Sequence, residues 1–553
     1  MAAAAIRFAA LVRVCAEAWL FSRACPRTRR RTLCGPQWDG KIQIACAPTP
    51  HHSPMFNGNL LTTPQPQSAD CNLSIANHLP VKAGMKTPGA CGFLYGSVSR
   101  FQFSVGGAIS VLQFSLPIGL SANICGMKLG WRLVISMLFS ALSVRAQSKP
   151  LVFNNVDVFD GYHILRGRTV TVEDGMIRSV TAAGVRPPDS AVVIDGAGRT
   201  LLPGLIDAHV HIGREESLEQ AAALGVTTVL DMWGDPTTLI PLKKEIERGE
   251  HPNAADFRTA GTGATVPRGH PTQMAGPEFP TLGAGDNVQA FVDARFAEGS
   301  DYLKIIYDHF LPTLSAEQLH ALVLAVHKRN KLVVAHEGTQ SEGLDEMRAG
   351  VDGIEHIFDD TPISREFLDT AVVSHAVFTP TLSIIQAVGG KPTGSVLATD
   401  PRFEPYILGW AFQILTTKLP ESLTKKHHYE NAQAAVRALH NAGITILAGT
   451  DSPNPDTSYG VSLHQELLLL TECGLSNEEA LRAATSSPAR EFGLVDRGRI
   501  ETGRRADLLL VKGDPSKDIR ATRDIVGVWK MGIAIHREEV AKRAAESRKN
   551  RQN

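Results

Sequence analysis

Cysteine is nearly absent from most of this 553-residue chain. Seven of its eight cysteines lie within residues 1–126, and only Cys473 lies beyond them. Because a disulfide needs two thiols, the chain after residue 126 cannot form an internal disulfide. Cys-x-x-Cys pairs are missing as well, so the sequence does not predict a zinc site built from cysteines.

Net charge is also lacking, because 56 lysines and arginines balance 56 aspartates and glutamates. This balance gives no sign of a nucleic-acid partner, and we predict none. The charges are distributed unevenly: residues 1–126 hold eleven basic and three acidic residues, a formal charge of +8, so the remainder carries −8. The chain therefore combines two different compositions.

Residues 1–126 show no sustained hydrophobic period of a strand or a helix. We predict a low-complexity or unstructured extension here. Its last part, 101–127, contains no charged side chain, but Pro117, Asn123 and many serines and glycines make it a poor match to a membrane span. We therefore predict no stable membrane insertion of the mature chain.

Residues 127–146 have the pattern of a secretory signal peptide. Met127 opens a stretch with two basic residues, followed by a ten-residue apolar run at 133–142 and a small-x-small sequence at 144–146. Since a signal peptide belongs at an N-terminus, we expect Met127 to be the true start and the mature chain to be exported, to the periplasm or out of the cell. The alternative is a genuine extension, in which the Ala- and Arg-rich residues 1–31 resemble a transit peptide.

Two regions with β-strand character flank the middle of the chain. Residues 147–204 contain short runs rich in valine, isoleucine and threonine, with turn sequences at Asp174-Gly175 and Asp195-Gly196. The same character returns in residues 495–540. We predict one small β-sandwich domain built from both flanks, followed by a polar tail at 541–553.

Residues 205–494 alternate between strand and helix signals. Eight candidate strands lie at 205–211, 226–232, 257–262, 301–307, 332–337, 351–357, 376–382 and 444–451. Helical stretches lie between them, two of which begin with the capping-box pairs Ser315/Gln318 and Ser476/Glu479, and 384–430 forms a long insertion. This alternation predicts an α/β fold with a (β/α)8 TIM-like barrel. The alternative, a doubly wound sheet, should carry a glycine-rich phosphate loop after its first strand, and this first strand ends in His-x-His instead.

His209 and His211 close the first candidate strand. Because side chains of a strand alternate, residues two apart share a face, and two imidazoles on one face make half of a metal site. Residues of ligand type also lie on four other candidate strands: Lys304, His336, His356 and Asp451. In a barrel the C-terminal strand ends meet at one mouth, so we expect these six side chains to converge.

Several motifs of the chain are similar to those of one enzyme superfamily. They are GRTLLPGLIDAHVH at 198–211, AGVDGIEH at 349–356, AGTDSP at 448–453, GVSLHQEL at 460–467 and GRRADL at 503–508. On these motifs, residues 150–535 resemble the amidohydrolase superfamily, and within it the imidazolonepropionase-like and prolidase-like members. The resemblance implies a distorted (β/α)8 barrel with a small β-sandwich and a metal-dependent hydrolase that acts on carbon–nitrogen bonds.

The resemblance also implies a centre with two divalent metal ions. His209, His211 and Asp451 would hold one ion, His336 and His356 the other, and Lys304 would bridge both as an N-carboxylated lysine. Carboxylation is needed because an ammonium cannot bind a cation, whereas a carbamate supplies two anionic oxygens. Zn2+ suits these ligands best, with Mn2+, Co2+ or Fe2+ as alternatives, and an unmodified Lys304 would leave a site for one ion. The ions would activate a water as hydroxide, and Asp451 would carry its proton to the leaving nitrogen.

The predicted substrate is a small molecule with an amide, a cyclic amide or an N-acyl amino acid bond. His270 lies where prolidase-like members place a substrate-binding histidine, and Tyr307 follows the strand of Lys304, so both are candidate substrate contacts. The alternatives are an Xaa-Pro or acyl-amino-acid dipeptidase and, less favoured, a non-catalytic barrel scaffold. A deaminase is disfavoured because Glu337 follows His336 directly and should point to the opposite face of the strand. The sequence is also compatible with a homo-oligomer.

Overall fold

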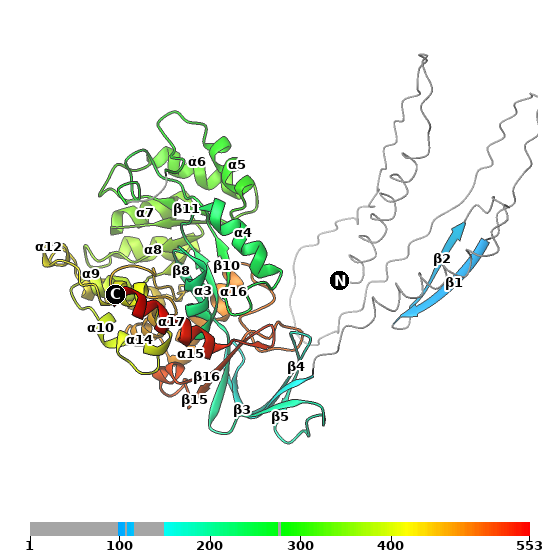
Figure 1. Ribbon diagram of the computed structural model, residues 1–553. Coiled ribbons are helices and arrows are strands. Elements are labelled where there is room, and N and C mark those ends of the chain that lie inside the picture. The colour runs from blue at the N-terminus through cyan, green and yellow to red at the C-terminus, as the bar shows by residue number, and fades with distance from the viewer. Residues whose placement is uncertain (1–97, 106–107, 116–148, 275–277, 553) are drawn as a thin grey trace, which may run out of the picture. The chain divides into compact units, whose positions relative to one another are not determined.

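The computed structural model describes residues 98–105, 108–115, 149–274 and 278–552 (Figure 1). The first two ranges are strands β1 (Val98–Val105) and β2 (Ala108–Ser115), which pair as an antiparallel hairpin. The predicted low-complexity or unstructured extension at 1–126 contains this hairpin and otherwise stays a prediction. The predicted signal peptide at 127–146 lies outside the described residues.

Both flanks of the chain contribute strands to one mixed sheet of eight strands. Its strands are β3 (Leu151–Phe159), β4 (Ile164–Glu173), β5 (Met176–Ala182), β6 (Val192–Asp195), β7 (Arg199–Pro203), β15 (Leu508–Lys512), β16 (Ile525–Lys530) and β17 (Ile533–Ala534). The antiparallel pair β7–β15 joins the flanks, with Leu202 opposite Leu509. The rings of Phe153 and Trp529, one from each flank, pack edge-on with centroids 4.8 Å apart. The two ends of the chain thus share one small hydrophobic core.

The two predicted turns of this sheet differ from each other. Asp174-Gly175 is the two-residue turn between β4 and β5, since Glu173 pairs with Met176. Asp195-Gly196 is not a hairpin turn, because β6 and β7 both pair in parallel with β3. The second turn therefore carries the chain along β3 rather than back upon itself.

Parallel strands alternate with helices in the middle of the chain, which makes the fold α/β (Figure 1). One parallel sheet holds β8 (Leu205–Val210), β9 (Val226–Asp231) and β10 (Asp256–Thr259), and a second holds β11 (Leu303–Ile306), β12 (Val333–His336), β13 (Gly353–Glu355) and β14 (Val377–Thr379). A single parallel bridge, Ala264 to Ile305, links the two sheets. The segment 444–452 is not the regular strand that we predict, and it contacts the sheets through the bridges Phe378–Ile446 and Val210–Ser452.

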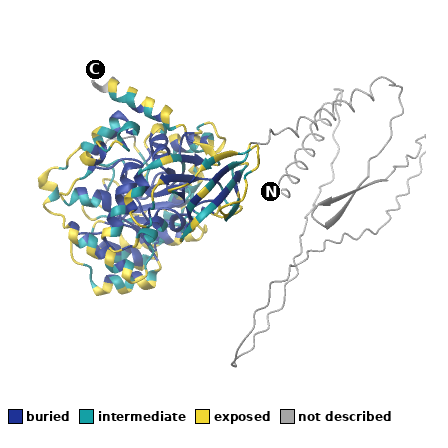
Figure 2. Ribbon diagram, turned by 90° about the horizontal axis from the view of Figure 1, so that it is seen from below, coloured by how far each residue is buried: buried dark blue, intermediate teal, exposed yellow. Residues whose placement is uncertain are grey.

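Helices cover these strands. They are α3 (Glu215–Ala223), α4 (Pro236–Glu247), α5 (Val288–Glu298), α6 (Ala316–His327), α7 (Gln340–Ala349), α8 (Arg365–Ser374), α13 (Tyr429–Asn441), α14 (Val461–Glu472), α15 (Asn477–Ala483), α16 (Ser486–Glu491) and the short η2 (Ile519–Arg523). The capping boxes predicted at Ser315 and Ser476 are confirmed. Buried residues run along the strands and exposed ones along the outer helices (Figure 2). No helix within the described ranges is both long and apolar enough to cross a membrane.

The insertion after β14 folds into short helices. They are α9 (Leu382–Val388), α10 (Gly394–Ala398), η1 (Glu404–Tyr406), α11 (Gly409–Thr416) and α12 (Glu421–Thr424). Asp456 accepts hydrogen bonds from the backbone N–H groups of Thr393 and Gly394, at 2.8 and 2.7 Å. Asp359 accepts from the N–H of His428, at 3.1 Å. These aspartates fasten the insertion to the loops that follow β13 and the segment 444–452.

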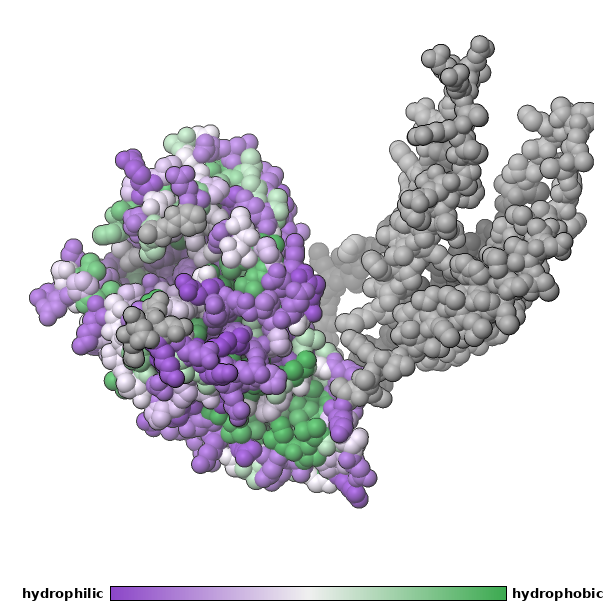
Figure 3. All heavy atoms as spheres, viewed as in Figure 1, coloured by the Kyte–Doolittle hydropathy of each residue, from purple (hydrophilic) through white to green (hydrophobic). Residues whose placement is uncertain are grey.

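The predicted polar tail is part of a docked helix, α17 (Arg537–Gln552). Ala544 is completely buried, and the hydroxyl of Ser547 accepts from the N–H of Gly409, at 3.1 Å. The guanidinium of Arg548 donates to the carbonyl of Ile407 at 2.6 Å. Composition alone does not predict this docking, because polar side chains of a helix can dock by binding the free carbonyls of a neighbouring segment. Most of the remaining visible surface is hydrophilic, apart from an apolar area over the flank sheet (Figure 3).

Replacing Gly409 by alanine should loosen the docking of α17. A Cβ atom at this position would lie 2.7 Å from the carbonyl oxygen of Ser547, so the helix must shift. We expect the free energy of unfolding to fall by about 1–3 kcal/mol, the usual range for overpacking. Urea denaturation measures this change. The exposed Lys549 of the same helix provides a control, since Lys549→Ala should change the stability by less than about 0.5 kcal/mol, and equal effects of both variants would contradict the docking contact.

Candidate metal site

A β-bulge sets the orientation of the two histidines at the end of β8. Ala208 lies in a buried cluster made mostly of strand residues, whereas Val210 lies in the cluster that packs against the helices. Strict alternation would place both on one face, but the pairing of β8 with β9 shifts its register between Asp207 and Val210. Because of this extra residue, His209 and His211 point to the same face of the strand as Ala208.

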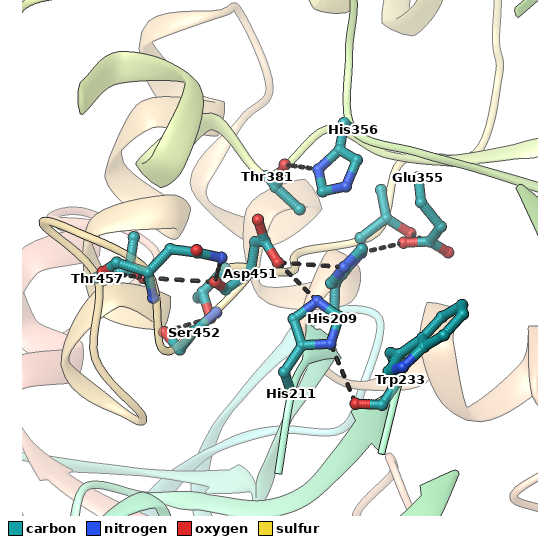
Figure 4. A network of polar contacts seen from close by, with 12 residues as sticks. His209, His211, Trp233, Glu355, His356, Thr381, Asp451, Ser452 and Thr457 are labelled. Atoms are coloured by element: carbon teal, nitrogen blue, oxygen red, sulfur yellow. Dashed lines mark hydrogen bonds and ion pairs between the residues drawn. The ribbon is translucent and has the colours of Figure 1, made fainter. Parts of the chain in front are cut away.

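His209, His211 and Asp451 form a compact group of metal-ligand type (Figure 4). One ligand atom of each lies within 4.8 Å of the other two. The Oδ1 atom of Asp451 is 3.0 Å from His211 Nε2 and 3.4 Å from His209 Nε2. The His209 side chain is fully buried, and that of Asp451 is 13% exposed.

The donor atoms of this group fit a divalent metal ion. Although they approach closely, His209 Nε2 and Asp451 Oδ1 have no hydrogen-bond partner within the described part of the chain. Buried polar atoms are normally paired, so unpaired atoms that converge on one point fit a cation site. Imidazole nitrogens and a carboxylate oxygen are the ligands that zinc and similar ions bind.

In three site histidines, the Nδ1 atom contacts another residue of the protein. The pairs are His209 with Glu355 Oε2 (2.6 Å), His211 with the carbonyl of Trp233 (3.3 Å) and His356 with the hydroxyl of Thr381 (2.8 Å). A carboxylate or a carbonyl can only accept, so Nδ1 of His209 and of His211 carries the proton. Their Nε2 atoms are therefore free to bind a cation.

The other residues of ligand type lie in the same region. The ring centroids of His209 and His356 are 4.6 Å apart, and those of His356 and His336 are 4.5 Å apart. Lys304 is 1% exposed, and its Nζ has no hydrogen-bond partner among the residues described. Its charge contributes to lowering the pKa of both His336 and His356. The structure thus brings together all six side chains that the sequence analysis selects, while their individual roles stay predictions.

Burial and neighbouring charges put His336, His356 and Asp451 in the protonation states that bind metals. Burial lowers the pKa of His336 and His356 well below the ordinary value, so both are neutral. Burial acts to raise the pKa of Asp451, but the contacts with His209 and His211 hold it well below the ordinary value. Burial lowers the pKa of Lys304 to about 8, so a part of the Lys304 side chains carries a neutral amine near physiological pH. Neutral imidazoles and an ionised carboxylate are the forms required for coordination.

Unusual backbone conformations shape the site. His356 and Asp451 have positive φ angles of 79° and 55°, which non-glycine residues rarely adopt and which concentrate at functional sites. Gly449 lies so close to β8 that a Cβ atom would be 2.8 Å from Cβ of His209. Only glycine therefore lets the segment before Asp451 lie against the strand of the two histidines.

The two predicted substrate contacts lie in different places. The ring of His270 stacks on His336, with centroids 5.4 Å apart and 24° between the planes, so it borders the ligand group. Tyr307 belongs to the cluster that packs against the helices, and its hydroxyl contacts Asp345 of α7 at 3.4 Å. It lies three residues after Lys304 and therefore on the opposite face of the chain. This geometry does not support a substrate contact from Tyr307.

Sequence reasoning misses Glu355 and Trp233. By strand alternation Glu355 should point away from the site, because it directly precedes His356. The positive φ angle of His356 breaks the alternation, so both side chains reach the ligand group. An acidic residue next to a candidate ligand is the available signal for Glu355, whereas no local pattern marks the carbonyl of Trp233.

Replacing Glu355 by glutamine should weaken metal binding about 10–100-fold, the usual effect of removing a carboxylate behind a histidine ligand. The amide cannot supply the negative charge that fixes and polarises the His209 ring. Competition with a chelator measures the metal affinity. Glu337→Gln is the matched control: Glu337 is also buried beside a site histidine, but it accepts from the N–H of Phe358 and burial raises its pKa well above the ordinary value. An equal loss in both variants would contradict the role of Glu355.

The fold and this group define an α/β protein with a His-His-Asp site that could hold a metal ion. Comparison with known families identifies the family. The model of the Amidohydrolase family matches residues 200–535, which is more than half of the chain. The chain belongs to the amidohydrolase family. It is a hydrolase that acts on carbon–nitrogen bonds.

Relatives and solved structures agree with this family. Over 103 residues the chain is 36% identical to an imidazolonepropionase of Deinococcus deserti. This matched stretch covers 18% of the chain and only 26% of that enzyme. It is 24% identical over 372 residues to a dihydroorotase of Geotalea daltonii, covering 61% of the chain and 82% of that enzyme. A solved Xaa-Pro dipeptidase with bound methionine matches with a TM-score of 0.59 and 22% identity, over 70% of this chain and 99% of that one. A putative prolidase from Bifidobacterium longum matches with a TM-score of 0.58 and 24% identity, over 72% and 99%. These two structures show a shared fold.

Proposed function

We propose that the chain hydrolyses the amide bond of a small substrate, such as an N-acyl amino acid, a dipeptide or a cyclic amide, with the help of divalent metal ions. The observation that carries this proposal is the convergence of ligand atoms from His209, His211 and Asp451, of which His209 Nε2 and Asp451 Oδ1 have no hydrogen-bond partner among the described residues. The relatives and structural neighbours support it, since imidazolonepropionase, dihydroorotase and Xaa-Pro dipeptidase are all named for substrates with carbon–nitrogen bonds.

The site residues divide into two ligand sets. In this proposal His209, His211 and Asp451 would hold one ion, His336 and His356 would hold a second, and Lys304 would bridge the two sets as the carbamate that its neutral amine forms with CO2. Zn2+ is the preferred ion, with Mn2+, Co2+ or Fe2+ as alternatives. When bound, the ions supply Lewis acidity, which polarises the substrate carbonyl and lowers the pKa of a water molecule.

Asp451 is the proposed proton carrier. Its carboxylate is ionised and has an oxygen without a hydrogen-bond partner among the described residues, so it can accept a proton from the attacking water. It then passes this proton to the leaving nitrogen, which would otherwise depart as a poor amide anion. His270, stacked beside His336, is placed to hold the substrate on the other side of the group.

We also infer that the parallel strands close into a (β/α)8 barrel with a flanking β-sandwich. Support comes from the bridges that connect successive sheets: Ala264–Ile305, Phe378–Ile446 and Val210–Ser452. Together with the two parallel sheets they connect neighbours around a ring. A barrel would place all proposed ligands at one mouth.

A dipeptidase that acts on Xaa-Pro or acyl-amino-acid bonds is the second candidate. It is favoured by His270, which lies beside the ligand group, and by the fold shared with an Xaa-Pro dipeptidase and a prolidase. A deaminase is disfavoured, because Glu337 points to Phe358 and α7 rather than to the ligand group.

A hydrolysis screen combined with metal analysis tests the proposal. The purified chain, supplied with Zn2+ or Mn2+, is incubated with dipeptides, N-acyl amino acids, lactams and lactones. We expect close to two transition-metal ions per chain and turnover of at least one amide class. Retention of metal without turnover of any amide would favour the non-catalytic scaffold, and hydrolysis of lactones alone would contradict an amide substrate.

A further inference from the structure

Two aromatic side chains pack against each other close to residues of the ligand group. The carbonyl of Trp233 accepts from Nδ1 of His211 at 3.3 Å, and Figure 4 draws this contact. Phe279, from the loop after β10, meets this indole edge-on, with ring centroids 5.1 Å apart and 75° between the planes. We call the pair Trp233 and Phe279 the aromatic wall.

The aromatic wall is held against the strand that carries Lys304. A Cβ atom on Gly263 would lie 2.5 Å from Cζ3 of Trp233 and 2.8 Å from the carbonyl oxygen of Lys304. Only glycine at this position therefore lets the indole lie so close to the backbone at β11. This close packing holds the indole beside the backbone of Lys304.

Core packing does not explain the aromatic wall. Both rings are only partly buried, and neither belongs to the hydrophobic clusters of the described residues. Tryptophan and phenylalanine each present a large apolar face. A ligand with an apolar group would cover the part of both rings that the protein leaves exposed.

We propose that the aromatic wall is a subsite for an aromatic or bulky aliphatic group of the substrate, next to the bond that is cleaved. The preferred substrates are then amides of apolar acids or N-acyl derivatives of apolar amino acids, rather than small or charged ones. This inference rests on the proposed function, because it names the substrate class of the same site. Burial of one phenyl group against the wall is expected to strengthen binding about tenfold or more.

Binding of two ligands that cannot be hydrolysed tests the subsite without any turnover. Isothermal titration compares 3-phenylpropionate with propionate on the full chain loaded with Zn2+. We expect 3-phenylpropionate to bind at least about tenfold more tightly, and Trp233→Ala and Phe279→Ala to remove most of this preference. Phe279→Ala is needed because the backbone of Trp233 also contacts His211. Phe310→Ala is the matched control, since Phe310 is 84% exposed on the loop after β11 and should leave the preference unchanged.

The outcomes separate the subsite from the proposed function. Equal binding of both ligands, no detectable binding of 3-phenylpropionate, or a preference that survives both wall variants would overturn the subsite. If the chain hydrolyses amides, kcat/KM for N-acetyl-L-phenylalanine should exceed that for N-acetyl-L-alanine, and Phe279→Ala should reduce this ratio mainly through KM. An aromatic preference in binding without amide turnover would support the subsite and reject the proposed function.

Discussion

Replacing Asp451 by asparagine should lower kcat by about 10³-fold or more, in line with the loss of a general base and acid. Asparagine has nearly the same shape, but it can neither take the proton from water nor return it to the leaving nitrogen. The contacts with His209 and His211 also keep the pKa of Asp451 low, so the wild-type carboxylate is ionised over the whole neutral range. Steady-state kinetics on the substrate found in the screen measure the effect.

The control for this variant lies in the same loop. Asp456 is also buried, but its carboxylate accepts from the backbone N–H groups of Thr393 and Gly394 instead of facing the ligand group. Asp456→Asn should therefore change kcat by less than about threefold. Thermal unfolding and metal analysis of both variants show whether the fold and the ions are retained. Turnover within tenfold of wild type for Asp451→Asn would remove Asp451 from proton transfer.

Local patterns predict much of this fold correctly. The capping boxes at Ser315 and Ser476 depend on neighbouring residues alone, and both helices begin where the pattern indicates. The strands around Lys304 and His336 are also found within a few residues, because short apolar runs between helices have few alternatives. The α/β alternation then suffices to place residues of ligand type at neighbouring strand ends.

Features that depend on distant contacts could not be predicted from local patterns. The bulge in β8 arises from its pairing with β9 and has no marker in the sequence around His209. The side on which Glu355 lies depends on the backbone angle of His356, and strand alternation alone gives the wrong side. The docking of Arg548 requires the free carbonyl of Ile407, which exists only once the insertion has folded. Alternation does predict that Tyr307 faces away from Lys304, although its position in the sequence favours a substrate contact.

Lys304→Met should remove at least one metal ion per chain and lower kcat by about 10³-fold or more, because the bridging group between the two ligand sets is lost. The same variant should stabilise the metal-free protein. The Nζ of Lys304 is buried without a hydrogen-bond partner in the described residues, and an unpaired buried polar group costs about 1–3 kcal/mol. Methionine has a similar length and needs no such partner. Metal analysis and urea denaturation after chelation measure the two effects.

Lys530→Met provides the contrast. This lysine is also buried, but it donates to the carbonyl of Ala254 at 2.6 Å and lies 3.3 Å from Asp256. Its loss should therefore destabilise the protein, since Asp256 and the carbonyl lose a partner. The same substitution would then distinguish Lys530, which contributes to stability, from Lys304, which reduces it. If Lys304→Met kept all its metal, or destabilised the metal-free protein as Lys530→Met does, the bridging role of Lys304 would be excluded.

The pH dependence of stability gives an independent measure of the Lys304 amine. Burial lowers the pKa of Lys304 to about 8, whereas the ordinary value is 10.5. Between these two values the unfolded chain binds the proton and the folded chain does not, so the contribution of Lys304 to the free energy of unfolding rises with pH. Below pH 8 both states are protonated and the folded state has to bury a charge. We therefore expect the advantage of Lys304→Met in the metal-free protein to be largest near pH 7 and to shrink as the pH approaches 10.5. An advantage that is independent of pH would show that the pKa of Lys304 is the same in the folded and the unfolded chain, and a lysine with an ordinary pKa would not have the environment required for a carbamate bridge.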